Sequence, residues 1–276
     1  MKPKVLVLKT DGTNCDEELF FAFKVAGGNP KIVHVNELRS KKENLKNYNI
    51  LAIPGGFSYG DDIVSGKILA IELTSFFSED LKKFIQRKNT LTIGICNGFQ
   101  VLVRTGILPF DTIGKMHVTL TNNDSRHFEC RWINLRIEPQ SKCVFLNTSD
   151  GGRLSSRSHD SSEVENNGMI SLQVAHGEGK FFANNKALKA IEQSNLVVFR
   201  YVDASGKLTQ KYPENPNGSL NAIAGITDKT GRVLGLMPHP ERFVKVEQHP
   251  NWRRMKIAYP HGLPIFENMI KYINSS

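Results

Sequence analysis

A short apolar run that ends among closely spaced glycines constrains this chain more than any other feature of its sequence. Leu91 to Ile95 is apolar and largely β-branched, and it leads through Gly94-x-Cys96-x-Gly98 into a helix-like segment. A strand, a tight turn and a helix form the layout of a nucleophile elbow, with the nucleophile at the turn. Glycines flank such a turn because a side chain there would collide with the neighbouring backbone. The pattern predicts that Cys96 is a nucleophile.

The predicted turn places the thiol of Cys96 where an anion is favoured. At a helix N-terminus the free N–H groups and the helix dipole stabilise a thiolate, and the same N–H groups can stabilise an oxyanion on a carbonyl under attack. The alternative is a small buried structural cysteine, and the two flanking glycines argue against it. The other cysteines, Cys15, Cys130 and Cys143, have no such frame, and Cys15 precedes three acidic residues. We expect these three to be structural.

Strand-like and helix-like segments alternate through the first part of the chain. The expected strands are Val5 to Leu8, Lys31 to Val35, Asn49 to Ile53 and Leu91 to Ile95. A helix is expected to start at Asn14, with Glu17 three residues later, and to end at Gly27-Gly28. The alternation predicts an α/β fold with a doubly wound, mostly parallel sheet and flanking helices, in which ligands bind at the carboxyl ends of strands. Gly55-Gly56 and Cys96 both follow strands, which predicts one shared site.

The second half of the chain is richer in β-structure. Further strands are expected at Trp132 to Ile137, Ile170 to Val174, Leu196 to Val202, Ala222 to Ile226 and Val233 to Met237, followed by a closing helix over Pro264 to Ile273. The polar stretch from Thr148 to Gly168 is predicted to be an irregular surface insertion. Neither an internal repeat nor a separating linker is apparent, so we expect a single domain over residues 1–276 with β-rich insertions.

Composition and charge exclude several classes of protein. Apolar residues make up 39% and charged residues 23% of the chain, which is ordinary for a globular protein. The apolar runs are too short to span a bilayer, and the start of the chain shows no signal peptide. Four widely spaced cysteines without a CxxC pair argue against a disulfide framework or a zinc site, so we expect a reducing, cytoplasmic compartment. The net charge of +9 is not accompanied by a nucleic-acid-binding motif. We assign most of it to the solvated surface, with an acidic protein partner as the alternative.

A cysteine nucleophile needs a base and a group that orients the base. Two histidines follow expected strands and precede a glutamate by two residues: His176, before Glu178, and His239, before Glu241. In an extended segment residues two apart point the same way, so either glutamate can orient its histidine. Prolines fix the backbone around His239, which mildly favours it over His176. The residues alone leave both histidines open as the base.

Three motifs resemble those of the class I (triad) glutamine amidotransferases. They are Gly94-Ile-Cys-Asn-Gly-Phe-Gln100, Pro54-Gly-Gly-Phe-Ser-Tyr-Gly-Asp61 and Gly235-Leu-Met-Pro-His-Pro-Glu-Arg242. Further stretches resemble the branch of that family that serves purine biosynthesis: Asn122 to Ser125, Phe128 to Trp132, Ala175 to Gly179 and Asn215 to Ser219. Asn97 and Phe99 stand where many other triad amidotransferases carry Leu and His, which narrows the subfamily. The resemblance covers most of the chain.

The resemblance implies a role for each matching residue. Cys96 would be the nucleophile, His239 the general base and then acid, and Glu241 the residue that orients His239. Gly55, Gly56 and Asn97 would contribute to the oxyanion hole, and Gln100 and Ser125 to the binding of glutamine. No metal ligand and no cofactor are implied for this chain.

The implied reaction also predicts a partner. A glutaminase of this family releases glutamate and ammonia, and the ammonia has to reach a synthetase subunit in a tight complex, with a small accessory subunit also expected. The chain contains no Walker-type phosphate loop, so ATP and Mg²⁺ are expected on the synthetase. The alternatives are another Cys-His-Glu hydrolase of the same fold, such as a peptidase or a different glutaminase, and a non-catalytic assembly subunit. The intact set of Cys96, His239 and Glu241 argues against the last of these.

Overall fold

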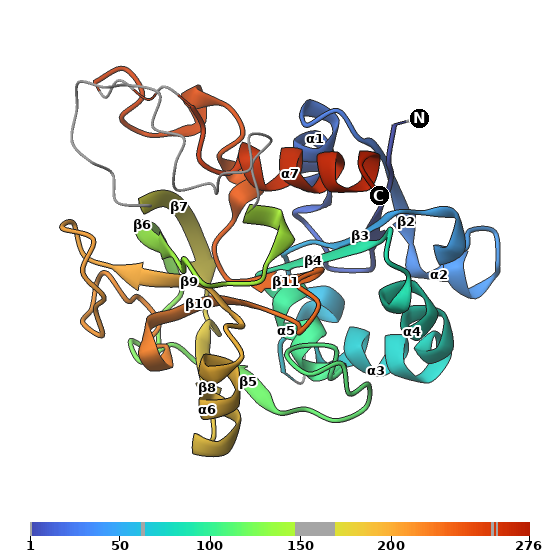
Figure 1. Ribbon diagram of the computed structural model, residues 1–276, viewed down its shortest axis with the longest axis horizontal. Coiled ribbons are helices and arrows are strands. Elements are labelled where there is room, and N and C mark those ends of the chain that lie inside the picture. Colours follow the sequence, from blue (N-terminus) through green and yellow to red (C-terminus); the bar gives the residue numbers. More distant parts are fainter. Residues whose placement is uncertain (1, 62–63, 147–168, 255–256, 258) are drawn as a thin grey trace.

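A nine-stranded sheet, half parallel and half antiparallel, forms the centre of the molecule (Figure 1). The computed structural model describes residues 2–276 except 62–63, 147–168, 255–256 and 258. The strands of this sheet are β1 (Lys4–Lys9), β2 (Asn29–His34), β3 (Ile50–Ile53), β4 (Leu91–Ile95), β6 (Glu129–Ile137), β7 (Met169–His176), β9 (Val197–Val202), β10 (Ile223–Thr227) and β11 (Val233–Leu236). Their order is β2-β1-β3-β4-β11-β10-β9-β6-β7. Pairs from β2 to β11 are parallel and pairs from β11 to β7 are antiparallel.

Helices cover both faces of the parallel half, as the predicted α/β fold class requires. The helices are α1 (Asp16–Val25), α2 (Val35–Arg39), α3 (Lys67–Phe76), α4 (Ser78–Gln86), α5 (Asn97–Arg104), α6 (Asn185–Gln193) and α7 (Leu263–Asn274). In Figure 1, α1 and α7 lie on one face of the parallel strands, and α3, α4 and α5 lie on the other. The flanking helices explain why β3 and β4 are buried along their whole lengths, since a parallel sheet is shielded from water on both sides.

The parallel order brings the carboxyl ends of β3, β4 and β11 together at one edge. Strand β4 lies between the other two, with Gly94 paired to Ile53 on one side and to Gly235 on the other. Close packing explains the glycines: a Cβ on Gly94 would lie 2.4 Å from the carbonyl oxygen of Gly98, and a Cβ on Gly98 would lie 2.0 Å from that of Ile53. Helix α5 can therefore approach the sheet only with glycine at both positions. This confirms the strand-turn-helix prediction.

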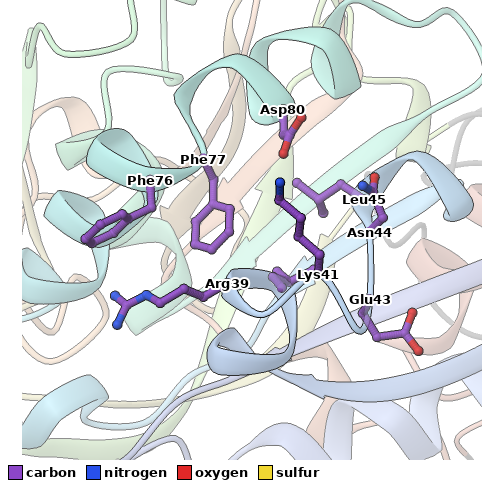
Figure 2. A pocket seen from close by; sticks show the side chains of 9 residues that line it. Arg39, Lys41, Glu43, Asn44, Leu45, Phe76, Phe77 and Asp80 are labelled. Atoms are coloured by element: carbon purple, nitrogen blue, oxygen red, sulfur yellow. The ribbon is translucent and has the colours of Figure 1, made fainter.

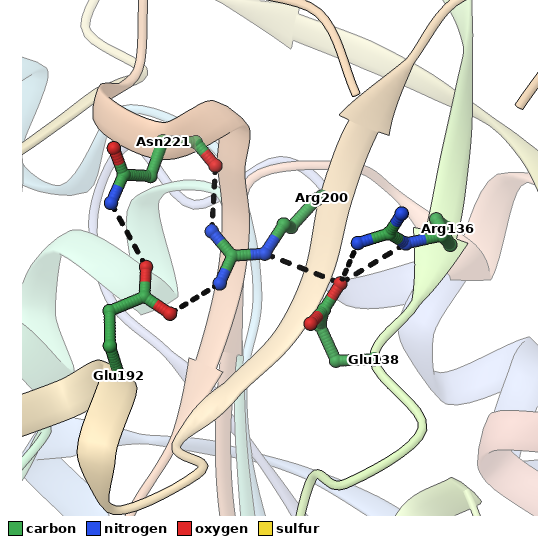
Figure 3. A network of polar contacts seen from close by, with 5 residues as sticks. All are labelled: Arg136, Glu138, Glu192, Arg200 and Asn221. Atoms are coloured by element: carbon green, nitrogen blue, oxygen red, sulfur yellow. Dashed lines mark hydrogen bonds and ion pairs between the residues drawn. The ribbon is translucent and has the colours of Figure 1, made fainter. Parts of the chain in front are cut away.

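The antiparallel half is joined by a polar network around Arg200, which is buried on β9 (Figure 3). The Arg200 guanidinium contacts Glu192 on α6 at 2.5 Å and Glu138, just after β6, at 3.3 Å. It also donates to the carbonyl of Asn221 at 2.7 Å, and Arg136 donates to Glu138 at 2.8 Å. Because several donors and acceptors are satisfied together, the network fixes β9 against β6 and α6.

Several details differ from the sequence-based prediction. The first helix begins at Asp16, with Cys15 as its N-cap and without a side-chain cap bond, so the predicted start at Asn14 is wrong. A separate two-stranded ribbon, β5 (Val118–Thr121) with β8 (Lys180–Ala183), was not predicted. The predicted insertion over 148–168 lies outside the described residues. Among the helices that the structure describes, none is long and apolar enough to cross a membrane.

Candidate active site

Cys96 lies in the tight turn between β4 and α5. Its backbone adopts φ 52° and ψ −107°, a conformation that a side-chain-bearing residue rarely takes. Strained backbone of this kind is common at functional sites, where the surrounding packing holds it in place. The thiol is nearly buried, at 6% exposure for the residue, and donates to the carbonyl oxygen of Ala175 over 3.6 Å. The geometry is that of the predicted nucleophile elbow.

His239 and Glu241 form a buried hydrogen-bonded pair after β11. The Nδ1 atom of His239 lies 2.6 Å from Oε1 of Glu241, and each residue is 1% exposed. The sequence-based reason for this pairing is wrong, because Pro240–Arg242 forms a 3-10 turn and is not extended. The turn folds the glutamate back onto the ring. The other ring nitrogen, Nε2, has no hydrogen-bond partner of good geometry among the described residues.

Gly55 shows how closely the three strand ends approach one another. A Cβ on Gly55 would lie 2.8 Å from Cε1 of His239 and 3.4 Å from Cβ of Cys96. The imidazole and the nucleophile therefore face each other over a glycine that has no room for a side chain. Because neighbouring parallel strands end at the same edge of the sheet, the residues after β3, β4 and β11 form one site.

The pKa of His239 is set by two opposing effects. Burial lowers it, because a buried imidazolium loses its hydration, whereas the Glu241 carboxylate and the nearby thiols of Cys96 and Cys15 favour the charged ring. The attraction is the stronger effect, so the pKa of His239 lies well above its ordinary value. A protonated His239 stabilises an anionic sulfur beside it, as in other thiol–imidazole pairs.

His176, the other candidate base, has a different environment. Its Nδ1 lies 3.1 Å from Oδ1 of Asn123, and its Nε2 lies 3.5 Å from Nδ2 of Asn217. Burial, and then the charge of His239, lowers the pKa of His176 to about 3. Both nitrogens of a neutral ring are thus engaged by amides, which leaves neither free to act on Cys96. The geometry favours His239 as the base and gives His176 the position of a structural residue.

The residues expected to hold the oxyanion lie beside the thiol. Gly56 adopts φ +131°, and a Cβ there would lie 2.7 Å from the backbone nitrogen of Asn14. Asn97 is the first residue of α5, so its backbone N–H has no intrahelical partner. These positions are compatible with an oxyanion hole formed by Gly55, Gly56 and Asn97, which stays a prediction.

The side chains expected to bind glutamine make contacts within the protein. Gln100 donates to the carbonyl of Glu178 at 2.6 Å and accepts from Asn97 at 3.0 Å. Asn97 also donates to Asp61 at 3.1 Å, a carboxyl whose pKa is raised by burial. Ser125 is half-buried and accepts from the backbone N–H of His127 at 3.3 Å. Binding of glutamine by Gln100 and Ser125 stays a prediction, and the Gln100 amide would have to exchange a partner to do so.

Sequence reasoning missed two residues beside the base, Cys15 and Arg242. Cys15 is 2% exposed, and its sulfur lies 3.2 Å from where a Gly55 Cβ would be. Arg242 donates to that sulfur at 3.3 Å and also to Glu18 at 3.1 Å. The available signal was the position of Cys15 after the first strand of a parallel sheet. What the sequence could not show is that this strand lies next to β3.

A hollow in the molecule lies away from these residues (Figure 2). It is formed between the segment that follows α2 and the junction of α3 and α4, and it is lined by Arg39, Lys41, Phe77 and Asp80 among others. None of its lining residues belongs to the cluster around Cys96. Its lining residues include no cysteine, serine, threonine or histidine, so it is not the candidate active site.

The chain is similar over nearly its whole length to proteins of known family. Residues 2–273 match the family described as the CobB/CobQ-like glutamine amidotransferase domain. The chain is 43% identical to phosphoribosylformylglycinamidine synthase subunit PurQ of Dehalococcoides mccartyi, over 98% of each chain. It is 38% identical to the PurQ subunit of Methanococcus maripaludis, over 99% of this chain and 98% of the relative. Among solved structures, PurLQS from Thermotoga maritima is similar, with a TM-score of 0.68, 27% identity and 99% coverage of both chains.

Proposed function

The chain belongs to the family of CobB/CobQ-like glutamine amidotransferases, and we propose that it is the glutaminase subunit of phosphoribosylformylglycinamidine synthase, an enzyme of purine biosynthesis. Full-length similarity to PurQ subunits supports this function. The observation that carries it is the cluster of Cys96, His239 and Glu241. The nucleophile lies at a strained turn, and the base is buried, oriented by a carboxylate over 2.6 Å and adjacent to the nucleophile.

In the first half of the reaction, the sulfur of Cys96 attacks the side-chain amide carbonyl of glutamine. The carbonyl oxygen becomes an oxyanion, which the backbone N–H groups of Gly56 and Asn97 would stabilise. His239 takes the thiol proton and gives it to the departing nitrogen, so ammonia leaves and a glutamyl thioester remains on Cys96. Glu241 holds the ring in one orientation and stabilises its charged form throughout.

In the second half, water hydrolyses the thioester. His239 removes a proton from the attacking water, the tetrahedral intermediate collapses, and the proton returns to the sulfur of Cys96 as glutamate leaves. The elevated pKa of His239, caused by Glu241 and the neighbouring thiols against the effect of burial, suits a group that carries a proton in both halves. No metal ion or cofactor has a part in these steps.

Ammonia is useful to the synthase only if it reaches the amide acceptor without being protonated in bulk water. The chain therefore works in a complex with the synthetase large subunit, and the similarity to PurLQS supports that assembly together with a small accessory subunit. We further propose that ATP and Mg²⁺ bind the large subunit, and that the complex acts in the cytoplasm, in keeping with four free cysteines in this chain.

The loop that carries Gly56 offers a means of control by the partner. It is held against the turn after β1, because Phe57 donates to the carbonyl of Gly12 at 2.9 Å and Tyr59 donates to that of Asp11 at 2.7 Å. Phe57 itself is 46% exposed, so a docked subunit can reach it. A peptide flip that withdraws one oxyanion donor costs roughly 3–4 kcal/mol, about a hundred- to a thousandfold in rate. We propose that docking selects the active orientation.

Reconstitution with the synthetase subunits tests the function. Glutamine-dependent formation of the amidine should vanish in Cys96→Ser, because a serine alkoxide is far harder to form than a thiolate. Synthesis from added ammonium salt should persist in the same variant, which shows that the complex still assembles. Near-normal turnover of glutamine by Cys96→Ser would refute the assignment.

The proposed control is measured separately. Glutamate release should be slow for the isolated chain and should rise on addition of the synthetase subunits and then of their nucleotide substrates. Equal rates under all three conditions would rule out control by docking and would leave the catalytic assignment intact.

A further inference from the structure

A second cysteine lies beside the catalytic pair, and no bond to its sulfur forms or breaks in the proposed reaction. The sulfur of Cys15, a ring nitrogen of His239 and a carboxylate oxygen of Glu241 all lie within 4.8 Å of one another. The three residues are at most 2% exposed. Within the described part of the chain, Nε2 of His239 and Oε2 of Glu241 are buried without a hydrogen-bond partner. Buried polar atoms are rarely left in this state, so both atoms are available to a ligand or a bound ion.

Cys96 brings a second thiol to the same point. The sulfur of Cys15 and the Cβ of Cys96 lie 3.2 Å and 3.4 Å from the position that a Cβ on Gly55 would occupy, and Cε1 of His239 lies 2.8 Å from it. The absence of a side chain on Gly55 therefore leaves the Cys15 sulfur, the Cys96 Cβ and the His239 imidazole around one small volume. These residues follow β1, β3, β4 and β11, so the parallel sheet, and not the spacing of cysteines in the sequence, assembles them.

Two thiolates and an imidazole nitrogen form a donor set that Zn²⁺ and related thiophilic divalent ions prefer. Mg²⁺ and other hard cations prefer oxygen ligands, so they bind this donor set more weakly. The bond from Nδ1 of His239 to Glu241, at 2.6 Å, also has the form usual in metal sites. A metal-binding histidine almost always uses its other nitrogen to contact a carboxylate, which fixes the ring and raises its basicity.

We propose that Cys15, Cys96 and His239 form an inhibitory site for a divalent ion of the zinc class, bound through two sulfurs and Nε2 with Glu241 supporting the ring. A bound ion occupies the nucleophile and the base at once, so glutamine hydrolysis stops. In tetrahedral coordination, bond lengths of ~2.3 Å to sulfur and ~2.0 Å to nitrogen place each bound sulfur roughly 3.5 Å from Nε2 of His239.

The charges around this site balance when the ion is bound. Two thiolates offset the ion, and the Arg242 guanidinium, 3.3 Å from the sulfur of Cys15, offsets Glu241. Compensated charge is what a buried site requires. Thiol ligands give up their protons when an ion binds, so binding should strengthen as the pH rises.

A cobalt titration of the purified, reduced chain tests the site without any turnover, so its outcome is independent of the proposed function. Co²⁺ should produce a sulfur-to-metal charge-transfer absorption with one ion bound per chain. Cys15→Ala should reduce that absorption to about half and weaken binding at least about tenfold, since one ligand is lost. Cys130→Ala is the matched control, because the Cys130 thiol is exposed, and it should leave both quantities unchanged.

Inhibition by Zn²⁺ supplies the functional test. Glutamate release by the complex should fall as Zn²⁺ is added and should recover with a chelator. Cys15→Ala should need at least about tenfold more Zn²⁺ to halve its own uninhibited rate. Equal sensitivity of Cys15→Ala and the unsubstituted chain, or an unchanged cobalt spectrum, would overturn the proposal.

Discussion

The segments around His176 and His239 begin alike and end in different structures. His176 is the last residue of β7 and His239 follows β11. Each precedes a glutamate by two residues, and each is buried. At His239 a 3-10 turn brings Glu241 onto Nδ1, and among the described residues Nε2 has no hydrogen-bond partner of good geometry. At His176 two asparagines lie against the two ring nitrogens. The two histidines therefore differ in the surroundings of their Nε2 atoms, and this difference separates a candidate base from a structural residue.

The local backbone explains why the two segments diverge. Pro240 opens the turn after His239, since its fixed φ suits the first position of a helical turn. Glycines flank Glu178, and a Cβ on Gly179 would lie 2.4 Å from the His176 ring, so the chain there folds across the imidazole. The segment after His176 thus encloses its ring, whereas the segment after His239 orients the ring toward Cys96.

The largest expected difference between the two segments is in turnover. His239→Ala should lower kcat on the order of a hundredfold or more, the usual scale for removing a general base. His176→Ala should lower it far less, because neither of its ring nitrogens faces the thiol. Steady-state glutamate release by the reconstituted complex measures both. Reversed losses would mean that His176 is the base.

Substitution of the glutamate after His239 should also lower turnover more than substitution of the glutamate after His176, but the difference should be smaller than for the histidines. Glu241→Gln keeps a hydrogen bond to His239 and removes the charge that raises its pKa, so we expect a loss of at least about tenfold and a shift of the pH–rate profile to lower pH. Glu178→Gln should change kcat by less than about twofold, since only its backbone carbonyl holds Gln100. A larger loss in Glu178→Gln than in Glu241→Gln would contradict the assignment of the orienting residue.

The two histidines should affect the pH dependence of the free energy of unfolding in opposite directions. The folded pKa of His176 is lowered to about 3 by burial, so the unfolded chain takes up a proton between pH 6.5 and about 3 that the folded chain does not. The free energy of unfolding then falls with decreasing pH by up to about 1.4 kcal/mol per unit. The folded pKa of His239 is raised, so its contribution is complete below pH 6.5 and is lost as the pH rises through that higher value.

Denaturant unfolding at a series of pH values measures this contrast. His176→Asn should flatten the decline in stability on the acid side, and His239→Asn should not. If both variants keep the slope of the unsubstituted chain, the environment described for His176 is wrong.

Much of the fold was predictable because its signals are local. The strand, turn and glycines around Cys96 predicted the elbow, and alternation of strands and helices predicted the parallel half of the sheet with its helical cover. The ribbon of β5 and β8 was missed, because two strands of four residues carry little periodicity. The spacing of the two His-x-Glu segments made Glu178 and Glu241 candidates for orienting the base, and the family resemblance favoured Glu241.

The environment of the site depended on strand order, which the sequence did not reveal. Cys15 was expected to be structural because acidic residues follow it, yet the placement of β1 beside β3 puts its sulfur against His239. The engagement of both ends of the Gln100 amide also depends on loops that meet only in the folded chain. Contacts between distant segments require the tertiary structure.

Covalent labelling with a chloroketone analogue of glutamine tests the central claim most directly, since the reagent needs both the glutamine site and an activated thiol. One adduct per chain should form on Cys96, located by peptide mass spectrometry. His176→Ala should be labelled at nearly the rate of the unsubstituted chain, and His239→Ala about a hundredfold more slowly. An adduct on another residue, or labelling that is lost in His176→Ala and retained in His239→Ala, would contradict the account.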